Sequence, residues 1–593
     1  MTAFPTGVFK THPQHAIRTT ITALSRITPR QAHLATCFCV GAAAAGFALH
    51  NGMQVRISNH CQYLLHGLHA ADPSFLVGDW FVTQTPDHHR VFSSLVRLLA
   101  HSNFLDQGLG LLNGIAAIGF ITSLYFIVAR FTQRPFGPFA ALLILVAFMP
   151  VNGPGHSSIL LPYFVPSVFS GVCLLIALTC LLYRRSLTAG VIAALGCAVH
   201  ANYLVLVGPV WLLFVALNPR GEKGRLAPKL FVPWAIASLP HLSLFGSLAA
   251  DESLSALSKH IFWNIYAPLH YAPASWPADW YLPFATTILA GLIAWRVRPK
   301  AFTATARRIV TSVGLVLLVG IIAILGVQSD FANALFPWRL APFLTIVAYV
   351  AIAMLFDAEG MPLGAGRMIA TACAIGLLAI SGFESRAIVL LFALYGLHLL
   401  GSFLSPPIEE SAKAHASIES RMVSGRRLIP LEAASMAVLL LLAAFGVRSG
   451  MWRQDIFQNN AGRDETTLFE WSRSTPTGTR FAVPPDLVNF RLETGRAVVI
   501  DFKSFPFTAT HQVEWMRRHE RQAGDPVLGY HDAVEKYAVL DAGRALDLAL
   551  EFGINYVVID RTRHVANLAP LSRVFRNDRF DVYEATPLLA SRP

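Results

Sequence analysis

Long apolar stretches alternate with short polar loops from residue 32 to residue 447, and the pattern then stops. A helix that crosses a bilayer needs about 20 apolar residues, or somewhat fewer where the bilayer thins. The pattern therefore predicts about thirteen transmembrane helices. Their expected ranges are 32–50, 108–129, 136–150, 161–183, 187–200, 203–217, 229–248, 281–295, 309–326, 338–356, 368–383, 387–405 and 431–447.

These elements predict a mainly α-helical, polytopic membrane protein with a small C-terminal α/β domain. The expected domains are a cytoplasmic N-terminal arm (1–31), a transmembrane domain (32–447) with a long first outer loop (51–107), and a periplasmic domain (448–593). When the helices alternate in direction, every cluster of basic loop residues falls on one side, which is typical of the cytoplasmic side. We therefore expect a bacterial inner-membrane protein whose N-terminus is cytoplasmic. The segment 187–217 fits two short helices or one broken helix, and the later charge clusters favour two.

The C-terminal region alternates strand-like and helix-like segments. Four short β-branched or aromatic runs are predicted strands: 481–483, 497–501, 556–560 and 580–583. Two of them contain the continuous apolar run Val-Val-Ile-Asp, which is typical of buried parallel strands. Residues 511–523 and 541–552 have helical spacing, and Gly553 is suited to end the second helix. No glycine-rich phosphate-binding motif follows the strands, so a lid or acceptor platform is favoured over a catalytic domain.

Composition narrows the function further. Hydrophobic residues make up 54% and charged residues 14% of the chain, against about 25% charged in a typical soluble protein. The net charge is +12, but residues 448–593 contain 19 basic and 19 acidic residues, so the excess lies in the membrane part. This placement indicates cytoplasmic loops rather than a nucleic-acid partner. Six of the seven cysteines lie in apolar stretches, which predicts neither a disulfide framework nor a thiolate metal site.

The first outer loop contains two aspartates of interest. Asp72 precedes Pro73, a pattern that predicts the N-cap of a short helix ended by Gly78. Asp79 follows that stop and precedes Trp80 and Phe81, aromatic residues suited to the level of the lipid headgroups. A carboxylate held near the membrane surface, partly out of water, suits a general base, so Asp79 is the candidate catalytic residue. A solvated loop aspartate is the alternative interpretation.

Several cations and histidines are candidate substrate-binding residues on the outer side. Arg339 begins a predicted helix at the outer face, where arginine is disfavoured, and a guanidinium binds phosphate bidentately. The alternative is ordinary snorkelling to phospholipid. Lys259 in the loop 249–280 could share this role. The remaining candidates are histidines, which could also be hydrogen-bonded structural residues: His88, His89, His156 and His200. The adjacent pair His88 and His89 lacks the spacing of a metal site, so no metal ligand is predicted.

The overall pattern resembles the GT-C superfamily of membrane glycosyltransferases. The resemblance rests on the helix number, the long first outer loop with its Asp, the paired short helices and the outer α/β domain. The stretches 72–81, 336–339, 483–491 and 499–503 also resemble uncharacterised bacterial membrane proteins grouped near that superfamily. The resemblance implies a polyprenyl-phosphate-linked sugar as donor and Asp79 as the base. Many members have a second acidic residue in the next outer loop, whereas residues 151–160 contain only His156 among ionisable residues.

The first hypothesis is an inverting glycosyltransferase in which Asp79 deprotonates the acceptor and Arg339, aided by Lys259 or His200, stabilises the departing lipid phosphate. Its partners would be the lipid-linked donor, membrane lipid and a glycan or lipid acceptor. This hypothesis requires no cofactor besides the lipid-linked donor, and no ligand motif in the sequence supports a divalent metal. The alternatives are a non-enzymatic transporter or assembly factor for cell-envelope glycans, or a glycan polymerase. The predicted spans contain few ionisable residues, which favours surface chemistry over transport.

Overall fold

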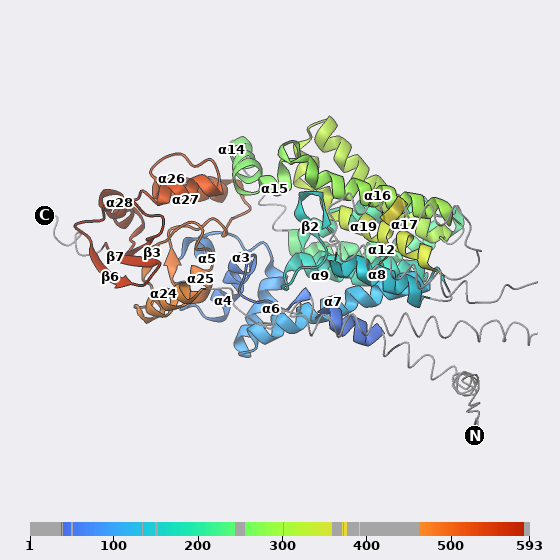
Figure 1. Ribbon diagram of the computed structural model, residues 1–593, viewed down its shortest axis with the longest axis horizontal. Coiled ribbons are helices and arrows are strands. Elements are labelled where there is room, and N and C mark those ends of the chain that lie inside the picture. The colour runs from blue at the N-terminus through green and yellow to red at the C-terminus, as the bar shows by residue number, and fades with distance from the viewer. Residues whose placement is uncertain are drawn as a thin grey trace, which may run out of the picture.

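The computed structural model describes residues 40–48, 51–132, 135–148, 152–242, 255–299, 302–357 and 462–585, together with a few single positions. The described chain is mostly helical, with a small sheet near its C-terminal end. Figure 1 shows an elongated molecule in which a bundle of helices fills one part and the C-terminal domain, with α24 to α28 and the main sheet, fills the other. We call the end of the bundle that carries this domain the outer end.

Four described helices are long and apolar enough to cross a membrane, judged by length and composition: Leu105–Ala129 (α7), Ala278–Val297 (α16), Ala304–Gly326 (α17 with η5) and Pro337–Phe356 (η6, α19 and η7). Shorter apolar helices accompany them: α8 (Phe136–Phe148), α9 (Pro166–Leu182), α10 (Ser186–Val199) and α11 (Ala201–Ala216). Each of the eight overlaps a predicted span. The predicted spans 368–383, 387–405 and 431–447 lie outside the described residues apart from single positions, so the number of thirteen stays a prediction.

The segment 187–217 forms two helices, as the later charge clusters favoured. Helix α10 packs against α9 and α12 (Arg220–Ser238), and α11 turns back from it at His200 to pack against α12 and α17. The close approach of α10 to α12 depends on Gly190, because a Cβ atom there would lie 2.1 Å from the carbonyl oxygen of Lys229. The turn at His200 places the start of α11 at the outer end of the bundle.

Arginines link the helix ends opposite the outer domain. Arg130 donates to the carbonyl of Leu182, and Arg308 donates to Asn218. Arg298 donates to Met354 and pairs with the buried Asp357 at 2.9 Å. These contacts show that residues 130, 182, 218, 298, 308 and 354–357 lie at one end of the bundle, which we call the basic end. The described clusters of basic residues that the sequence assigns to inner loops all belong to it.

The C-terminal domain is built on a five-stranded sheet of order β4-β3-β5-β7-β6. Strands β3 (Arg480–Ala482), β4 (Ala497–Val498) and β5 (Tyr556–Asp560) are parallel, which confirms the prediction from the two Val-Val-Ile-Asp runs. Strands β6 (Ser572–Arg576) and β7 (Phe580–Glu584) add an antiparallel edge. The predicted helices are α26 (Ala509–Ala523) and α28 (Ala542–Phe552), and Gly553 ends α28 with φ +67°. Helix α27 spans Tyr530–Tyr537.

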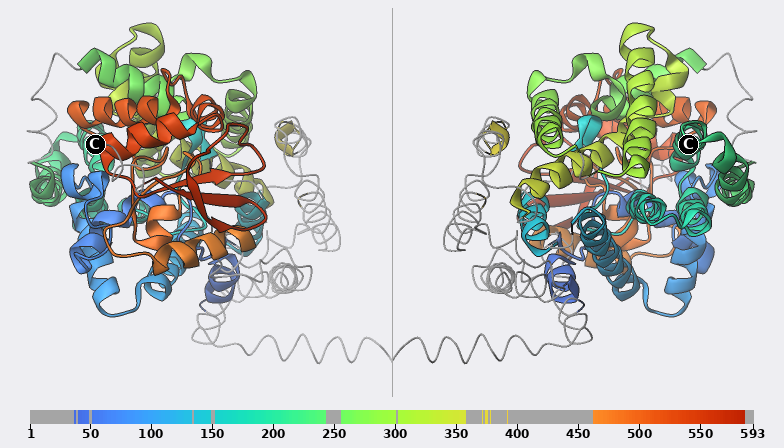
Figure 2. Two further views of the ribbon diagram at one scale, coloured as in Figure 1. Left: turned by 90° about the vertical axis from the view of Figure 1, so that its left-hand side faces the viewer. Right: turned by 90° about the vertical axis from the view of Figure 1, so that its right-hand side faces the viewer.

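The C-terminal domain has three layers: α24, the sheet, and α26 with α28. The left panel of Figure 2 faces this domain. Alternate strand residues pack against the two helical layers. Phe481 and Val558 pack with Leu468 and Phe469 of α24 (Arg463–Ser474) on one face of the sheet. Val557 and Ile559 point to the other face, toward Trp515 of α26 and the buried side of α28. This second core is continuous with the hydrophobic core of the bundle. The C-terminal domain is therefore packed onto the bundle rather than only tethered to it.

The first outer loop makes much of this junction. It contains α3 (His60–Tyr63), α4 (Leu65–Ala71), α5 (Trp80–Gln84) and α6 (Arg90–His101). Gln62 donates to the carbonyl of Phe505 at 2.7 Å, and the amide of Leu76 donates to Gly495 at 3.0 Å. The rings of Tyr266 and Phe505 stack with centroids 3.9 Å apart. Tyr266 belongs to a second set of outer elements: α14 (Ser255–His260), η3 (Ile261–Tyr266), α15 (Pro268–Tyr271) and η4 (Pro273–Ser275).

Two local expectations for this loop are wrong. Residues 73–78 form turns rather than a helix, and Asp72 is the C-cap of α4 whose carboxylate accepts the amide and hydroxyl of Ser74. Trp80 does not lie at a lipid surface, because it is buried beneath the guanidinium of Arg518 at 4.7 Å. The proline signal failed because the aspartate side chain stabilises a turn as readily as a helix start.

Candidate functional site

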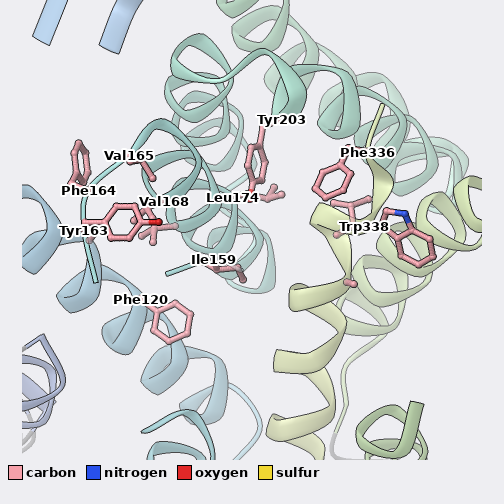
Figure 3. Close-up of a cluster of buried hydrophobic side chains, with 14 of the residues drawn as sticks. Phe120, Ile159, Tyr163, Phe164, Val165, Val168, Leu174, Tyr203, Phe336 and Trp338 are labelled. Carbon is pink, nitrogen blue, oxygen red and sulfur yellow. The ribbon is translucent and has the colours of Figure 1, made fainter. Parts of the chain in front are cut away.

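Arg339 lies at the outer end of the bundle, in the 3-10 turn η6 (Pro337–Leu340) that leads into α19 (Ala341–Ala353). Phe336, in the left-handed region with φ +49°, sets the sharp entry into this turn. The Arg339 guanidinium carbon lies 5.2 Å from the Phe336 ring centroid and 5.9 Å from that of Tyr203. Figure 3 shows the Tyr203 ring on α11 and the Phe336 ring at the entry to η6.

Among the described residues, no carboxylate pairs with the charge of Arg339. No ion pair joins it to an acidic residue within the described part of the chain, and its buried Nε has no hydrogen-bond partner there. The half-buried guanidinium is hydrogen-bonded to Tyr203, but a buried donor without a partner, such as this Nε, is costly and usually marks a place for a ligand or water. The surroundings of the Arg339 side chain are therefore suited to bind an anion.

Two histidines complete this group. The ring centroids of His89 and His200 lie 5.2 Å apart, and Tyr63 packs edge-on against His89 at 4.8 Å. His200 accepts the amide of Asn202 through Nδ1 at 3.3 Å and so caps α11. Burial lowers the pKa of His89 to about 4, with the charge of Asp87 opposing this effect and that of Arg339 adding to it. At neutral pH His89 is therefore an uncharged hydrogen-bonding group beside a cation.

His88 and His270 lie at the edges of the cluster. The ring of His88 packs on Phe507 at 4.8 Å, and burial lowers its pKa to about 3. Its buried Nε2 has no partner within the described residues. His270 binds the carbonyl of Gly155 through Nδ1 at 2.6 Å, and burial lowers its pKa to about 4. Both rings are therefore neutral polar groups at neutral pH.

The structure separates two predicted residues from this group. Lys259 pairs with Asp330 at 2.9 Å, so its charge is already matched. Asp330 begins α18 (Asp330–Ala334), in the loop before η6. His156, in η1 (Pro154–His156) between the short strands β1 (Asn152–Gly153) and β2 (Ser157–Ser158), is exposed and packs edge-on against Trp280 at 4.4 Å. The cluster that the structure assembles contains Arg339, His200, His89 and, at its border, His88.

Asp79 lies in a different environment, at the junction with the outer domain. Its side chain is fully buried and caps α5 by accepting the amide of Phe81 at 2.9 Å. Its other oxygen accepts the Nε of Arg491 at 2.8 Å and the amide of Val498 at 3.1 Å. Arg491, in α25 (Phe490–Thr494), is fully buried too and also pairs with Asp501. This network gives Asp79 a structural role, and its catalytic role stays a prediction.

Sequence reasoning missed several members of both groups. Tyr63 and His270 were overlooked because such residues are common in outer loops, and Tyr203 because a tyrosine at the start of an apolar helix carries no spacing signal. Asp87 was visible next to the two histidines. Its carboxylate accepts the amide of His89 at 2.9 Å, and its charge also acts on His66, whose pKa burial lowers. Asp87 therefore places a carboxylate beside the cluster that contains Arg339.

A metal centre finds no support in the described residues, since no three His, Cys, Asp or Glu side chains gather there in a way that could hold an ion. Among the described cysteines, Cys61, Cys173, Cys180 and Cys197 are free thiols.

The fold and the site define a mostly helical protein with several helices suited to cross a membrane and a small α/β domain at its outer end. Residues 463–521 match a family model described as a domain of unknown function, DUF6798. The matched segment runs from α24 into α26 and contains Arg491 and Asp501, the partners that link the domain to the first outer loop. No curated protein matches the chain significantly.

Proposed function

We propose that this protein is an integral-membrane glycosyltransferase that moves a sugar from a polyprenyl-phosphate donor to a glycan or lipid acceptor at its outer face. The observation that supports this most is the guanidinium of Arg339, which has no carboxylate partner among the described residues and lies at the outer end of the bundle among neutral histidines. A guanidinium is the side chain best matched to phosphate, because it donates two parallel hydrogen bonds. The apolar helices beside it suit a ligand with a long hydrocarbon tail.

The reaction is a displacement at the anomeric carbon. The oxygen of an acceptor hydroxyl attacks this carbon, and the bond from the carbon to the donor phosphate oxygen breaks. Polyprenyl phosphate leaves with the bonding electron pair, and the hydroxyl proton passes to a carboxylate. Arg339 stabilises the charge that develops on the leaving phosphate, and one such donor is typically worth about 3 kcal/mol of the barrier.

Two carboxylates of the first outer loop compete for the role of proton acceptor. The expectation from sequence is Asp79, but both of its oxygens are occupied and its side chain is fully buried. Asp87 accepts the amide of His89, and the charge of Arg339 also acts on the His89 ring. We assign proton acceptance to Asp87 because a base must reach the substrate.

Ligand binding tests the phosphate site directly. The full chain in nanodiscs should bind undecaprenyl phosphate more tightly than undecaprenol, which lacks the phosphate. Arg339→Gln should weaken phosphate-lipid binding at least about tenfold, and Arg339→Lys should weaken it less. Arg220→Gln, which removes an exposed arginine from the basic end, is the matched control and should leave binding unchanged. Equal binding of both lipids would remove the basis of the proposal.

Sugar transfer from a panel of polyprenyl-phosphate hexoses and pentoses tests the chemistry. Asp87→Asn should abolish transfer while lipid binding and the melting temperature stay unchanged. Asp79→Asn should instead lower the melting temperature, because Arg491 loses an anionic partner. Loss of transfer in Asp79→Asn with an unchanged melting temperature would return the role to Asp79. Binding without transfer from any donor would favour the carrier or assembly factor.

A further inference from the structure

A second feature suited to a ligand lies near the basic end, away from Arg339. It is an apolar cavity that opens to the side of the bundle, bounded by α7, α9, α16, α17 and α19; its free space is about 590 Å³ when the space at the open side is included. All of its lining side chains are apolar, among them Phe131, Leu175, Leu182, Trp295, Phe302 and Val313. Val310 and Val347 in its wall are only half-buried, so the cavity reaches the side of the bundle. An apolar space of this kind suits a hydrocarbon chain.

Two arginines mark one end of this cavity. Arg130 donates through Nε to the carbonyl of Leu182, and Arg307 donates to the carbonyl of Phe302 at 3.2 Å. Leu182 and Phe302 are both lining residues, so both guanidinium groups lie where the apolar wall ends. In the described part of the chain, neither arginine forms an ion pair with a carboxylate. Arg307 is exposed, and each arginine has donors left for a ligand.

The aromatic residues near these arginines support a headgroup boundary. The rings of Trp295 and Phe302 stack with centroids 3.9 Å apart, and Phe131 packs against Phe302 at 4.9 Å. Tryptophan is enriched where the hydrocarbon layer meets the headgroups. Next to Trp295, Arg296 is also exposed. Toward the basic end, the apolar wall of the cavity is therefore followed by the stacked rings of Trp295 and Phe302 and then by the arginines.

We propose that this cavity binds one anionic diacyl phospholipid from the leaflet at the basic end, with an acyl chain between α7, α9 and α17 and the phosphate beside Arg130 and Arg307. Charge complementarity selects an anionic headgroup, because the two guanidinium groups at this end of the cavity have no carboxylate partner among the described residues. The site is separate from the phosphate site at Arg339, so it does not depend on the proposed transferase activity.

Native mass spectrometry of the full chain tests this proposal. The protein is reconstituted in vesicles of equal parts phosphatidylglycerol and phosphatidylcholine and then released. We expect one retained lipid per chain, with phosphatidylglycerol favoured at least about tenfold. The double variant Arg130→Gln and Arg307→Gln should lose this preference, and Val313→Trp should lose the retained lipid. Arg220→Gln and Leu318→Trp, which change an exposed arginine and an exposed leucine elsewhere, should retain both properties.

A photo-crosslinking residue at position 313 identifies the occupant without relying on the fold of a filled variant. An adduct with the mass of phosphatidylglycerol supports the proposal. A crosslink to residues 358–461 of the same chain would overturn it, because that segment would then fill the cavity. No preference between the two phospholipids would overturn it as well, and so would retention of undecaprenyl phosphate in preference to phosphatidylglycerol when both lipids are present in the vesicles.

Discussion

At the residue scale, the most informative side chain is Arg491, which is fully buried between Asp79 and Asp501. A buried arginine between two carboxylates satisfies their charges, but the three groups depend on one another. When one partner is removed, the others stay buried without compensation, which costs more than the pair contributes. Loss of any one of these three side chains is therefore expected to weaken the packing of the C-terminal domain on the first outer loop.

Replacing Arg491 with Gln should therefore destabilise the outer domain by about 3–5 kcal/mol. Hydrogen exchange of the amides in β3, β4 and β5 measures this loss directly. Arg473→Gln is the matched control, because Arg473 also pairs with a carboxylate, that of Glu493, but is 48% exposed. Its loss should cost less than about 1 kcal/mol. Equal effects of the two substitutions would contradict the special role of Arg491.

A second prediction at this scale concerns pH. Burial lowers the pKa of His60 to about 4, and the ring binds the carbonyl of Phe164 at 2.8 Å. The His60 ring therefore binds a proton at lower pH in the folded protein than in the unfolded chain, where the pKa of histidine is about 6.5. Stability from this group is complete above pH 6.5 and falls as the pH drops toward 4, by about 3 kcal/mol in total.

His60→Gln tests this prediction, because glutamine keeps a donor for the carbonyl but does not titrate. The melting temperature of this variant should fall less steeply between pH 6.5 and 4 than that of the parent protein. His101→Gln, at an exposed histidine, should leave the slope unchanged. An unchanged slope in His60→Gln would show that other groups govern the acid sensitivity.

The residue scale also shows where sequence reasoning ends. Asp79 was selected correctly as an unusual aspartate, but its partner Arg491 lies 412 positions away, and no local pattern reports such a pairing. The cap on α5 could have been predicted, since an aspartate after a glycine turn commonly starts a helix. Arg339 was selected because it begins a predicted helix at the outer face, and His200 because it ends a short predicted helix there; the structure places both near His89.

At the element scale, the packing of α10 against α12 makes a prediction that needs no knowledge of function. A methyl group at Gly190 would collide with the backbone of Lys229, so Gly190→Ala should force the two helices apart and cost about 1–3 kcal/mol. Gly314 in α17 has open space around it, so Gly314→Ala should be neutral or slightly stabilising. Melting temperatures in one detergent compare the two. A neutral Gly190→Ala would contradict the close packing.

The same scale separates predictable from unpredictable elements. Strand β5 coincides with its predicted range, because a continuous β-branched run can be little else in so short a segment. Helix α26 begins within two residues of its predicted start, since its apolar positions repeat at helical spacing. Strand β6 was missed because its residues are mostly exposed and carry no burial pattern. In the first loop, α3, α4 and α5 were missed because helices of four to seven residues are too short to show a periodicity. Helix α6 has 12 residues and a strongly amphipathic pattern, so it could have been predicted.

At the scale of the whole molecule, the two ends of the bundle differ in a way that predicts orientation. The described inner-loop arginines gather at the basic end, and the C-terminal domain covers the opposite end. Positive charge is retained on the cytoplasmic side during insertion, so the outer domain should face the periplasm. The sequence predicted this asymmetry because charge counts in short loops need no tertiary information, whereas the docking of the domain onto the first loop does.

Cysteine labelling in intact spheroplasts tests this orientation, in a variant whose seven native cysteines are replaced. Leu528→Cys places a thiol on the outer domain at a side chain that is 76% exposed. Gly221→Cys places one at the start of α12, at the basic end, where added atoms meet nothing within 4 Å. A membrane-impermeant maleimide should label position 528 in intact spheroplasts and position 221 only after permeabilisation. The reverse result would place Arg339 and its neighbours in the cytoplasm, and a donor sugar displayed on the periplasmic face could then not reach them.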